Sequence, residues 1–163
     1  MSEFEKATGE VNKVLTDYEE MMNKVQATLQ EKMKDIFTAF FNTHPNVKTI
    51  HWTQYAPHFN DGEECIFSVN EPHFTATEYT KLVNREHAWG ECDDGIITSR
   101  MWDSKQRKYV DNNIDPALIT DMDTLSGILQ SGAYEGVLRA MFDTHVWVKA
   151  HRGGFDVDDF DHD

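Results

Sequence analysis

The sequence predicts an α+β fold: a long N-terminal helix, an antiparallel sheet built from hairpins, a C-terminal helical segment packed on the sheet, and a short acidic tail. Three observations predict it, namely a three- to four-residue apolar period before residue 44, alternating polarity after residue 46, and a helix start at residue 115. A chain of 163 residues has the length of one domain. We expect one α+β domain at 1–154, with the long helix at 1–44, and an acidic aromatic tail at 155–163.

The N-terminal helix is predicted from two rows of apolar side chains with the seven-residue spacing of a heptad repeat. The rows are Phe4, Val11, Tyr18 and Val25, and Leu15, Met22, Leu29 and Ile36. Two interpretations stay open. The N-terminal half folds back or frays while the C-terminal half packs on the sheet, or residues 4–36 pair two copies as a homodimer. Pro45 ends the helix, because proline disfavours helical geometry in the residue before it.

A β-hairpin is predicted next, from the segments "VKTIHWTQY" at 47–55 and "ECIFSVN" at 64–70. Ile50 and Trp52 share one face of the first strand, and Cys65 is expected to point inward from the second. Between the strands, "NDG" at 60–62 is a turn signal, because these residues tolerate a positive φ. The aromatic residues of the hairpin are therefore expected to build a core.

The second half of the chain predicts further short elements. A short helix and an acidic loop are expected at 75–95, and a second hairpin at 96–110 turns near residues 104–106. Asp115 before Pro116 predicts a helix start, and residues 116–143 form one broken helix or two. A strand follows at 145–151, the segment "HVWVKAH". The pair Gly153 and Gly154 is interpreted as a hinge before the tail "FDVDDFDHD".

The charge balance restricts the classes of partner. The chain carries 29 acidic and 15 basic residues, a formal net charge of −14, so its average field repels phosphate and anionic lipid. Direct nucleic-acid binding is disfavoured, and a protein partner is expected instead. There is no apolar run near twenty residues and there are two cysteines, from which we expect no membrane insertion and a cytoplasmic location.

Motifs for catalysis or cofactor binding are not found in the sequence. Histidines and cysteines are present, but no pair has the spacing of a structural zinc site, so no metal is expected. The thiol of Cys92 lies among carboxylates, which suppress a thiolate. Phosphate-binding glycine loops are also missing, and no cofactor is expected. Enzymatic activity stays open, with the balance against it.

Candidate binding residues are the aromatic and acidic side chains of the first hairpin and of the tail. They are Trp52, Tyr55, His58, Asp61, Glu63, Glu64, Phe155, Asp158, Asp159 and Phe160. A segment of acids with apolar anchors can dock its phenylalanines into a basic pocket of a partner or onto its own domain. A disordered solubilising end is the alternative interpretation of the tail.

The segment "IHWTQYAPHFNDGEECIFSVNEPHF" resembles a signature of small acidic proteins of tailed bacteriophages, in which "WTQY", "FNDG" and "CxFSV" stand in this order. The resemblance covers about a sixth of the chain and implies a protein made in an infected host cell, with a host or phage macromolecule as partner. It assigns no role to any residue.

The preferred function is a non-enzymatic phage accessory protein that binds this macromolecule through an acidic surface, as an inhibitor or a DNA mimic. One alternative is a small-ligand or nucleotide-binding protein or enzyme with a pocket beside the 48–70 hairpin. The other is an oligomeric structural or assembly protein that associates through the N-terminal helix.

Overall fold

A computed structural model describes residues 2–57, 62, 65–76, 95–98, 100–103 and 105–160 of the protein. Four of the candidate binding residues, His58, Asp61, Glu63 and Glu64, lie outside the described residues. The helix and acidic loop predicted within 75–95 also fall almost entirely outside them, as does Cys92.

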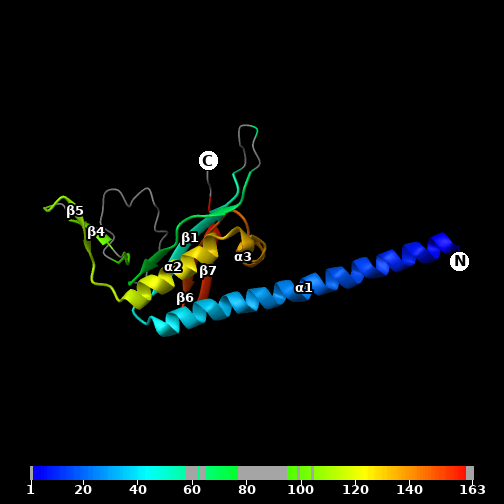
Figure 1. Ribbon diagram of the computed structural model, residues 1–163, viewed down its shortest axis with the longest axis horizontal. Helices are drawn as coiled ribbons and strands as arrows, with labels where there is room; N and C mark the ends of the chain where they lie inside the picture. The colour runs from blue at the N-terminus through cyan, green and yellow to red at the C-terminus, as the bar shows by residue number, and fades with distance from the viewer. Residues whose placement is uncertain are drawn as a thin grey trace.

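Helix α1 spans Glu3–Thr43 and confirms the long N-terminal helix. Ser2 caps it with a reciprocal capping box, in which the Ser2 hydroxyl accepts from the Glu5 backbone N–H and the Glu5 carboxylate accepts from the Ser2 N–H. The helix ends before His44, and the His44 imidazole contacts the Asp121 carboxylate at 2.6 Å. Figure 1 shows the C-terminal part of α1 beside the rest of the protein and its N-terminal part extending away from it.

The main sheet is antiparallel and joins segments from the middle and the end of the chain. Its strands are β1 (Thr49–Tyr55), β2 (Ser68–Val69), β3 (His73–Thr75), β6 (Val146–His151) and β7 (Gly154–Asp159). Strand β1 pairs with β6 along one side and with both β2 and β3 along the other, and β7 follows β6. The strand predicted at 145–151 is confirmed by β6, which lies between β1 and β7 in the sheet.

The first hairpin is confirmed, with a shorter second strand than expected. Gln54 pairs with Val69 and Tyr55 pairs with Ser68. The inward position predicted for Cys65 is wrong, because Cys65 precedes β2 and its side chain is exposed.

The remaining elements connect the two halves of the sheet. The second hairpin is confirmed by β4 (Arg100–Asp103) and β5 (Lys108–Asp111), which form a separate two-stranded sheet. Two helices follow, α2 (Pro116–Gln130) and α3 (Glu135–Phe142), separated by the 3-10 turn η2 (Gly132–Tyr134). Asp115 caps α2, because its carboxylate accepts from the Ala117 N–H at 2.9 Å.

The predicted acidic tail at 155–163 is corrected by the structure, because strand β7 occupies most of it. His151 pairs with Gly154, so Arg152 and Gly153 form a two-residue hairpin turn in place of the predicted hinge. Gly154 has a φ of +137°, a conformation that favours glycine. The domain therefore extends at least to Asp159.

The core lies where the C-terminal part of α1 and helices α2 and α3 meet the sheet. From α1 it takes Met33, Phe37, Phe40 and Phe41, and from the sheet Ile50, Trp52, Val148 and Ala150. Helices α2 and α3 add Leu125, Leu129, Val137, Leu138 and Phe142. We call this packed unit, residues 33–160 as described, the body of the protein. The body holds the C-terminal end of α1, and the N-terminal end of α1 lies outside the body.

Candidate functional site

The exposed part of α1 carries a continuous apolar stripe. Nine large apolar side chains of this part are each at least 45% exposed, and Phe4 reaches 77%. They are Phe4, Val11, Val14, Leu15, Tyr18, Met21, Met22, Val25 and Leu29, and we call this set the α1 stripe. Monomeric proteins rarely expose a long contiguous apolar surface, so such a surface marks an interaction site.

The stripe is the uncovered continuation of the helix face that packs on the body. At 100° per residue, Met33 and Phe40 lie within about 20° of Phe4 around the helix axis. Both are buried in the core, whereas Phe4 is exposed. One helix face therefore has two environments, and the body covers only its C-terminal part.

The boundary between the two environments lies near Gln26. Among the described residues, the hydrogen bond nearest the N-terminus that joins α1 to the rest of the protein runs from the Gln26 Nε2 to the Gly136 carbonyl in α3, at 3.2 Å. Figure 1 shows α1 continuing well beyond α3 toward the N-terminus. In the described part of the protein, the segment before Gln26 is thus a helix with exposed apolar side chains and no tertiary hydrogen bond, although helices draw most of their stability from packing.

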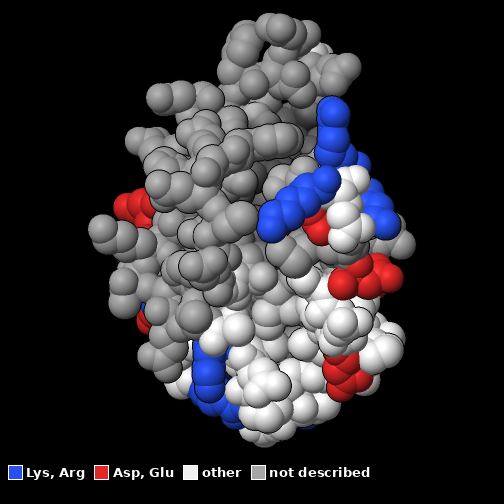
Figure 2. Space-filling model, turned by 90° about the vertical axis from the view of Figure 1, so that its left-hand side faces the viewer, with Lys and Arg blue, Asp and Glu red and all other residues white. Residues whose placement is uncertain are grey.

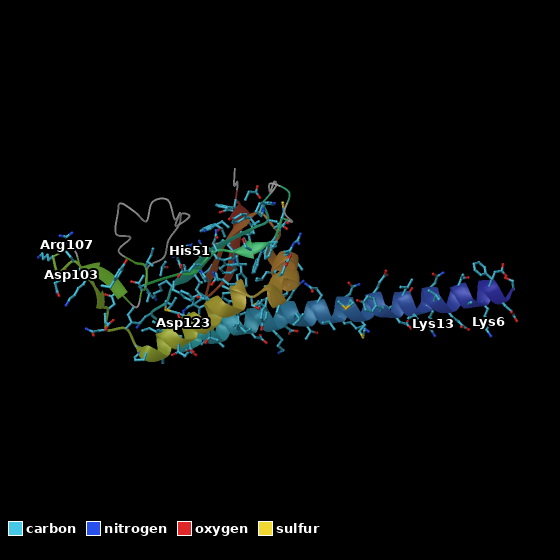
Figure 3. All side chains as sticks on the ribbon, turned by 45° about the horizontal axis from the view of Figure 1, so that its top comes forward. Lys6, Lys13, His51, Asp103, Arg107 and Asp123 are labelled. Atoms are coloured by element: carbon cyan, nitrogen blue, oxygen red, sulfur yellow. The ribbon has the colours of Figure 1, made fainter. Side chains whose placement is uncertain are left out.

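The side chains around the stripe distinguish its faces. A hollow of about 220 Å³ lies along the stripe, lined by Phe4, Ala7, Thr8, Val11 and Asn12. Lys6 and Lys13 lie roughly opposite Phe4 around the axis, at 100° per residue. Figure 3 shows both lysines on the part of α1 that extends beyond the body. The extended segment is therefore amphipathic, with one apolar and one charged face.

A second candidate is a row of titratable side chains across the sheet. His51 pairs with His73 of β3 on one side and with Lys149 of β6 on the other, and Lys149 pairs with Asp156 of β7. The Lys149 ammonium donates to the Asp156 carboxylate at 2.6 Å, and this hydrogen bond lowers the pKa of Asp156. All four residues share one face of the sheet, because side chains of paired residues point the same way.

The burial of His51 argues against a catalytic role for this row. Its side chain is 1% exposed and its Nε2 contacts the Thr49 hydroxyl at 2.6 Å. Burial, with smaller contributions from Lys149 and His73, lowers the pKa of His51 to about 4. His51 is therefore neutral near pH 7 and inaccessible. Among the described residues, no group of three His, Cys, Asp or Glu side chains could hold a metal ion.

A third candidate is a cleft between α1 and the β6–β7 turn. It has a volume of about 520 Å³ and is lined in part by Lys34, Phe37, His151, Arg152 and Phe155. The Arg152 guanidinium donates to the Phe41 carbonyl, which ties the turn to α1. This cleft is not the pocket that was expected beside the 48–70 hairpin. The described residues that line the cleft come from α1 and from residues 151–155.

The aromatic candidates from the sequence lie mainly inside the body. Trp52 is 2% exposed and stacks on Phe37, so it is a core residue and not a surface anchor. Phe155 is half-buried against Phe37 and Phe142. Tyr55 and Phe160 lie together, with ring centroids 6.0 Å apart. The structure thus brings the hairpin and the end of the chain together through packing.

The acidic candidates Asp158 and Asp159 are exposed on β7, at the edge of the main sheet. Charged side chains on an edge strand hinder pairing with a strand of another chain. This structural role explains the acidic residues of β7 without invoking a binding partner. Their presence alone therefore does not identify a binding surface.

The β4–β5 hairpin is a local exception to the acidic composition. Lys105, Arg107 and Lys108 are exposed there, and the Asp103 carboxylate accepts the backbone N–H groups of Lys105 and Gln106 at 2.8 and 3.0 Å. Figure 2, which views this end of the molecule, shows basic and acidic side chains interspersed among the described residues. Figure 3 places Asp103 and Arg107 at the far end from α1's N-terminus.

Comparisons of the chain with models of protein families, with curated proteins and with solved structures found no match. In the part of the chain that the structure describes, no helix is long and apolar enough to cross a membrane. Among the described surfaces, the α1 stripe is the strongest candidate for an interaction site. The heptad pattern indicated it in the sequence, although no stripe residue was among the candidate binding residues.

Proposed function

We propose that this protein is a non-enzymatic assembly protein that associates with a second copy of itself through the α1 stripe. The observation that carries the proposal is the row of nine exposed apolar side chains on α1, eight of which lie before Gln26, where no tertiary hydrogen bond to the described residues holds the helix. Covering these side chains would contribute roughly 25 cal/mol for each Å² of apolar surface removed from water. A second α1 is a suitable cover, because its stripe has the same length and the same heptad spacing.

The charged residues of α1 also favour pairing of two α1 helices in solution over binding of α1 to a lipid surface. The face away from the stripe carries both lysines and acids, among them Lys6, Lys13 and Glu20, which suits a solvent-exposed outer face. The many acids of the chain disfavour anionic lipid as the cover. A second α1 presents a matching apolar face, and burial of the two apolar faces has to outweigh the repulsion between two chains that each carry a net charge of −14.

The test is the molar mass in solution, measured by light scattering coupled to gel filtration over a range of concentrations. In the stripe variant, Val11→Gln, Tyr18→Gln and Met22→Gln, the apolar seam is interrupted by residues with good helix propensity. The matched control, Lys13→Gln with Glu20→Gln, changes the opposite face and, like the stripe variant, keeps the net charge. Circular dichroism and tryptophan fluorescence report whether the body still folds.

We expect a mass above that of the 18.9 kDa chain for the wild type and the control, and a monomer for the stripe variant. A wild-type protein that stays monomeric at every concentration would overturn the proposal. A stripe variant that associates as strongly as the wild type would move the interface elsewhere and contradict the role of α1.

Binding of a host or phage macromolecule through an acidic surface stays a prediction from the sequence. Its acidic candidates that the structure describes, Asp158 and Asp159, have a sufficient role as edge-strand charges. Self-association through α1 is compatible with such binding, since it leaves the body exposed.

A further inference from the structure

We propose that the two α1 helices of the assembly run antiparallel, so that each N-terminus lies beside the body of the other copy. This inference rests on the proposed function and adds the orientation of the partner. It follows from three features of α1: the position of the body, the length of the stripe, and the charges beside the stripe.

The position of the body disfavours a parallel pair. Met33 and Phe40 are buried in the core and lie on the same helix face as the stripe. The body therefore occupies the space over the C-terminal end of the stripe. A parallel copy laid on the stripe in register would bring its own C-terminal third, with its own body, into that occupied space.

An antiparallel copy fits the length that is left uncovered. With the two-fold axis near Leu15, Phe4 of one copy lies opposite Val25 of the other, and Val11 lies opposite Tyr18. The partner helix then begins next to Gln26, where the contact between α1 and Gly136 of α3 begins. The overlap from Phe4 to Val25 is about six helical turns, or about 33 Å, and it includes eight of the nine stripe residues.

The residues along one flank of the stripe favour the same orientation. At seven-residue steps this flank reads Glu5, Asn12, Glu19 and Gln26, so an acid alternates with an amide. In antiparallel helices a flank faces the same flank of the partner, which places Glu5 opposite Gln26 and Asn12 opposite Glu19. In a parallel pair this flank would instead face the one that carries Glu10 and Asp17, and carboxylates would meet carboxylates.

The opposite flank is less favourable, because Glu10 and Asp17 approach each other in the antiparallel pair. At the end of that flank, Glu3 lies near Lys24, which offsets part of the repulsion. The orientation is thus decided mainly by the position of the body and by the glutamate-to-amide pairing, and salt is expected to strengthen the assembly slightly by screening Glu10 and Asp17.

Photo-cross-linking of the full chain tests the orientation. Thr8 at the edge of the stripe is replaced by p-benzoylphenylalanine, the associated protein is irradiated, and the cross-linked tryptic peptides are identified by mass spectrometry. In the antiparallel pair, position 8 lies opposite Met22, in the tryptic peptide 14–24. Within one straight helix these positions are 14 residues, or about 21 Å, apart, so this cross-link forms between two copies.

We expect the link from position 8 to residues 21–24 to dominate. A dominant link between two copies of peptide 7–13 would show parallel helices and overturn the inference, while the doubled mass in light scattering would leave the proposed function standing. A monomeric mass of the wild-type chain, with no cross-linked dimer, would overturn both. If the Thr8 variant fails to associate, the same probe is placed at Ala7, which lines the same hollow beside Phe4 and Val11, and residues 20–23 are its antiparallel target.

Discussion

The ring of Phe37 in α1 stacks on the indole of Trp52 in β1, with ring centroids 5.6 Å apart and an angle of 16° between the ring planes. Phe155 of β7 meets the same Phe37 ring edge-on, with centroids 5.1 Å apart. One side chain of α1 thus contacts both the centre and the edge of the sheet. This contact fixes the rotation of α1 about its axis and hence the direction in which the stripe faces.

Removing the Phe37 ring is expected to destabilise the body strongly. Phe37→Ala should lower the free energy of unfolding by about 3–5 kcal/mol, because the ring is buried and leaves a cavity. Val14→Ala, in the exposed part of the same helix, should change it by less than about 0.5 kcal/mol in the monomer. Urea denaturation followed by tryptophan fluorescence measures both, at a concentration where the chain is monomeric. Equal losses in the two variants would contradict the assigned boundary of the body.

The burial of His51 predicts a loss of stability in mild acid. The folded protein keeps His51 neutral down to its pKa of about 4, whereas the unfolded chain binds the proton near pH 6.5. The unfolded state therefore binds more protons between these values, and the free energy of unfolding falls by up to about 3 kcal/mol as the pH drops from 6.5 to 4.

Urea denaturation of the wild type and of His51→Gln at pH 7.5, 6.5, 5.5 and 4.5 measures this effect. The variant is expected to be less stable at pH 7.5 but to show a shallower loss toward pH 4.5, since glutamine does not titrate. The same slope in both proteins would show that other groups cause the pH dependence.

Two glycine substitutions, one next to the β6–β7 turn and one in α2, are expected to change stability in opposite directions. Gly154→Ala should cost about 1–3 kcal/mol, because a φ of +137° is strained for any residue with a Cβ. Gly127→Ala, in α2, should stabilise the protein by about 0.5–1 kcal/mol, because its Cβ would meet no atom within 4 Å and alanine favours the helix. Thermal unfolding of the two variants beside the wild type gives both signs, and a tolerated Gly154→Ala would argue against the two-residue turn.

The helix of the exposed segment of α1 is expected to be more stable at high protein concentration, where the chains are associated, than at low concentration. A helix without packing opens readily, so backbone amides at 3–25 should exchange with deuterium faster on dilution, as the assembly dissociates. Amides at 33–41, which the body covers, should keep their protection. Hydrogen exchange with mass spectrometry at two concentrations compares the segments. Protection of 3–25 that does not change with dilution would mean that the segment needs no partner.

The local elements of this fold were predictable because each has a local signal. The heptad period predicted most of α1, Pro45 predicted its end, and the Asp115–Pro116 pair predicted the start of α2. The pairing of β1 with β6 had no such signal, since it joins residues nearly one hundred positions apart. The burial of Trp52 and Phe155 depends on that pairing, and this is why both stood among the candidate binding residues, although the aromatic residues of the first hairpin were also expected to build a core.

Strand β7 shows how an edge strand can be mistaken for a tail. Phe155 and Val157 alternate with Asp156 and Asp158, a strand period, but the high acid content led to the interpretation of a tail that either docks on a partner or is disordered. The acids are tolerated because β7 lies at the sheet edge, where one row of side chains meets solvent. The exposure of the α1 stripe could not be predicted either, because a heptad pattern does not show whether the surface that covers it belongs to the same chain or to another.

The 41 residues of α1 also act as a spacer, about 62 Å long. In an antiparallel pair the two bodies stand at opposite ends of this rod, and every surface of the body is displayed twice at a nearly constant separation. A target that repeats with this separation would be held at two points, and the second attachment would profit from the high effective concentration that the rod imposes. Inserting one heptad before Gln26 would then shift the preferred repeat by about 10 Å without touching either body.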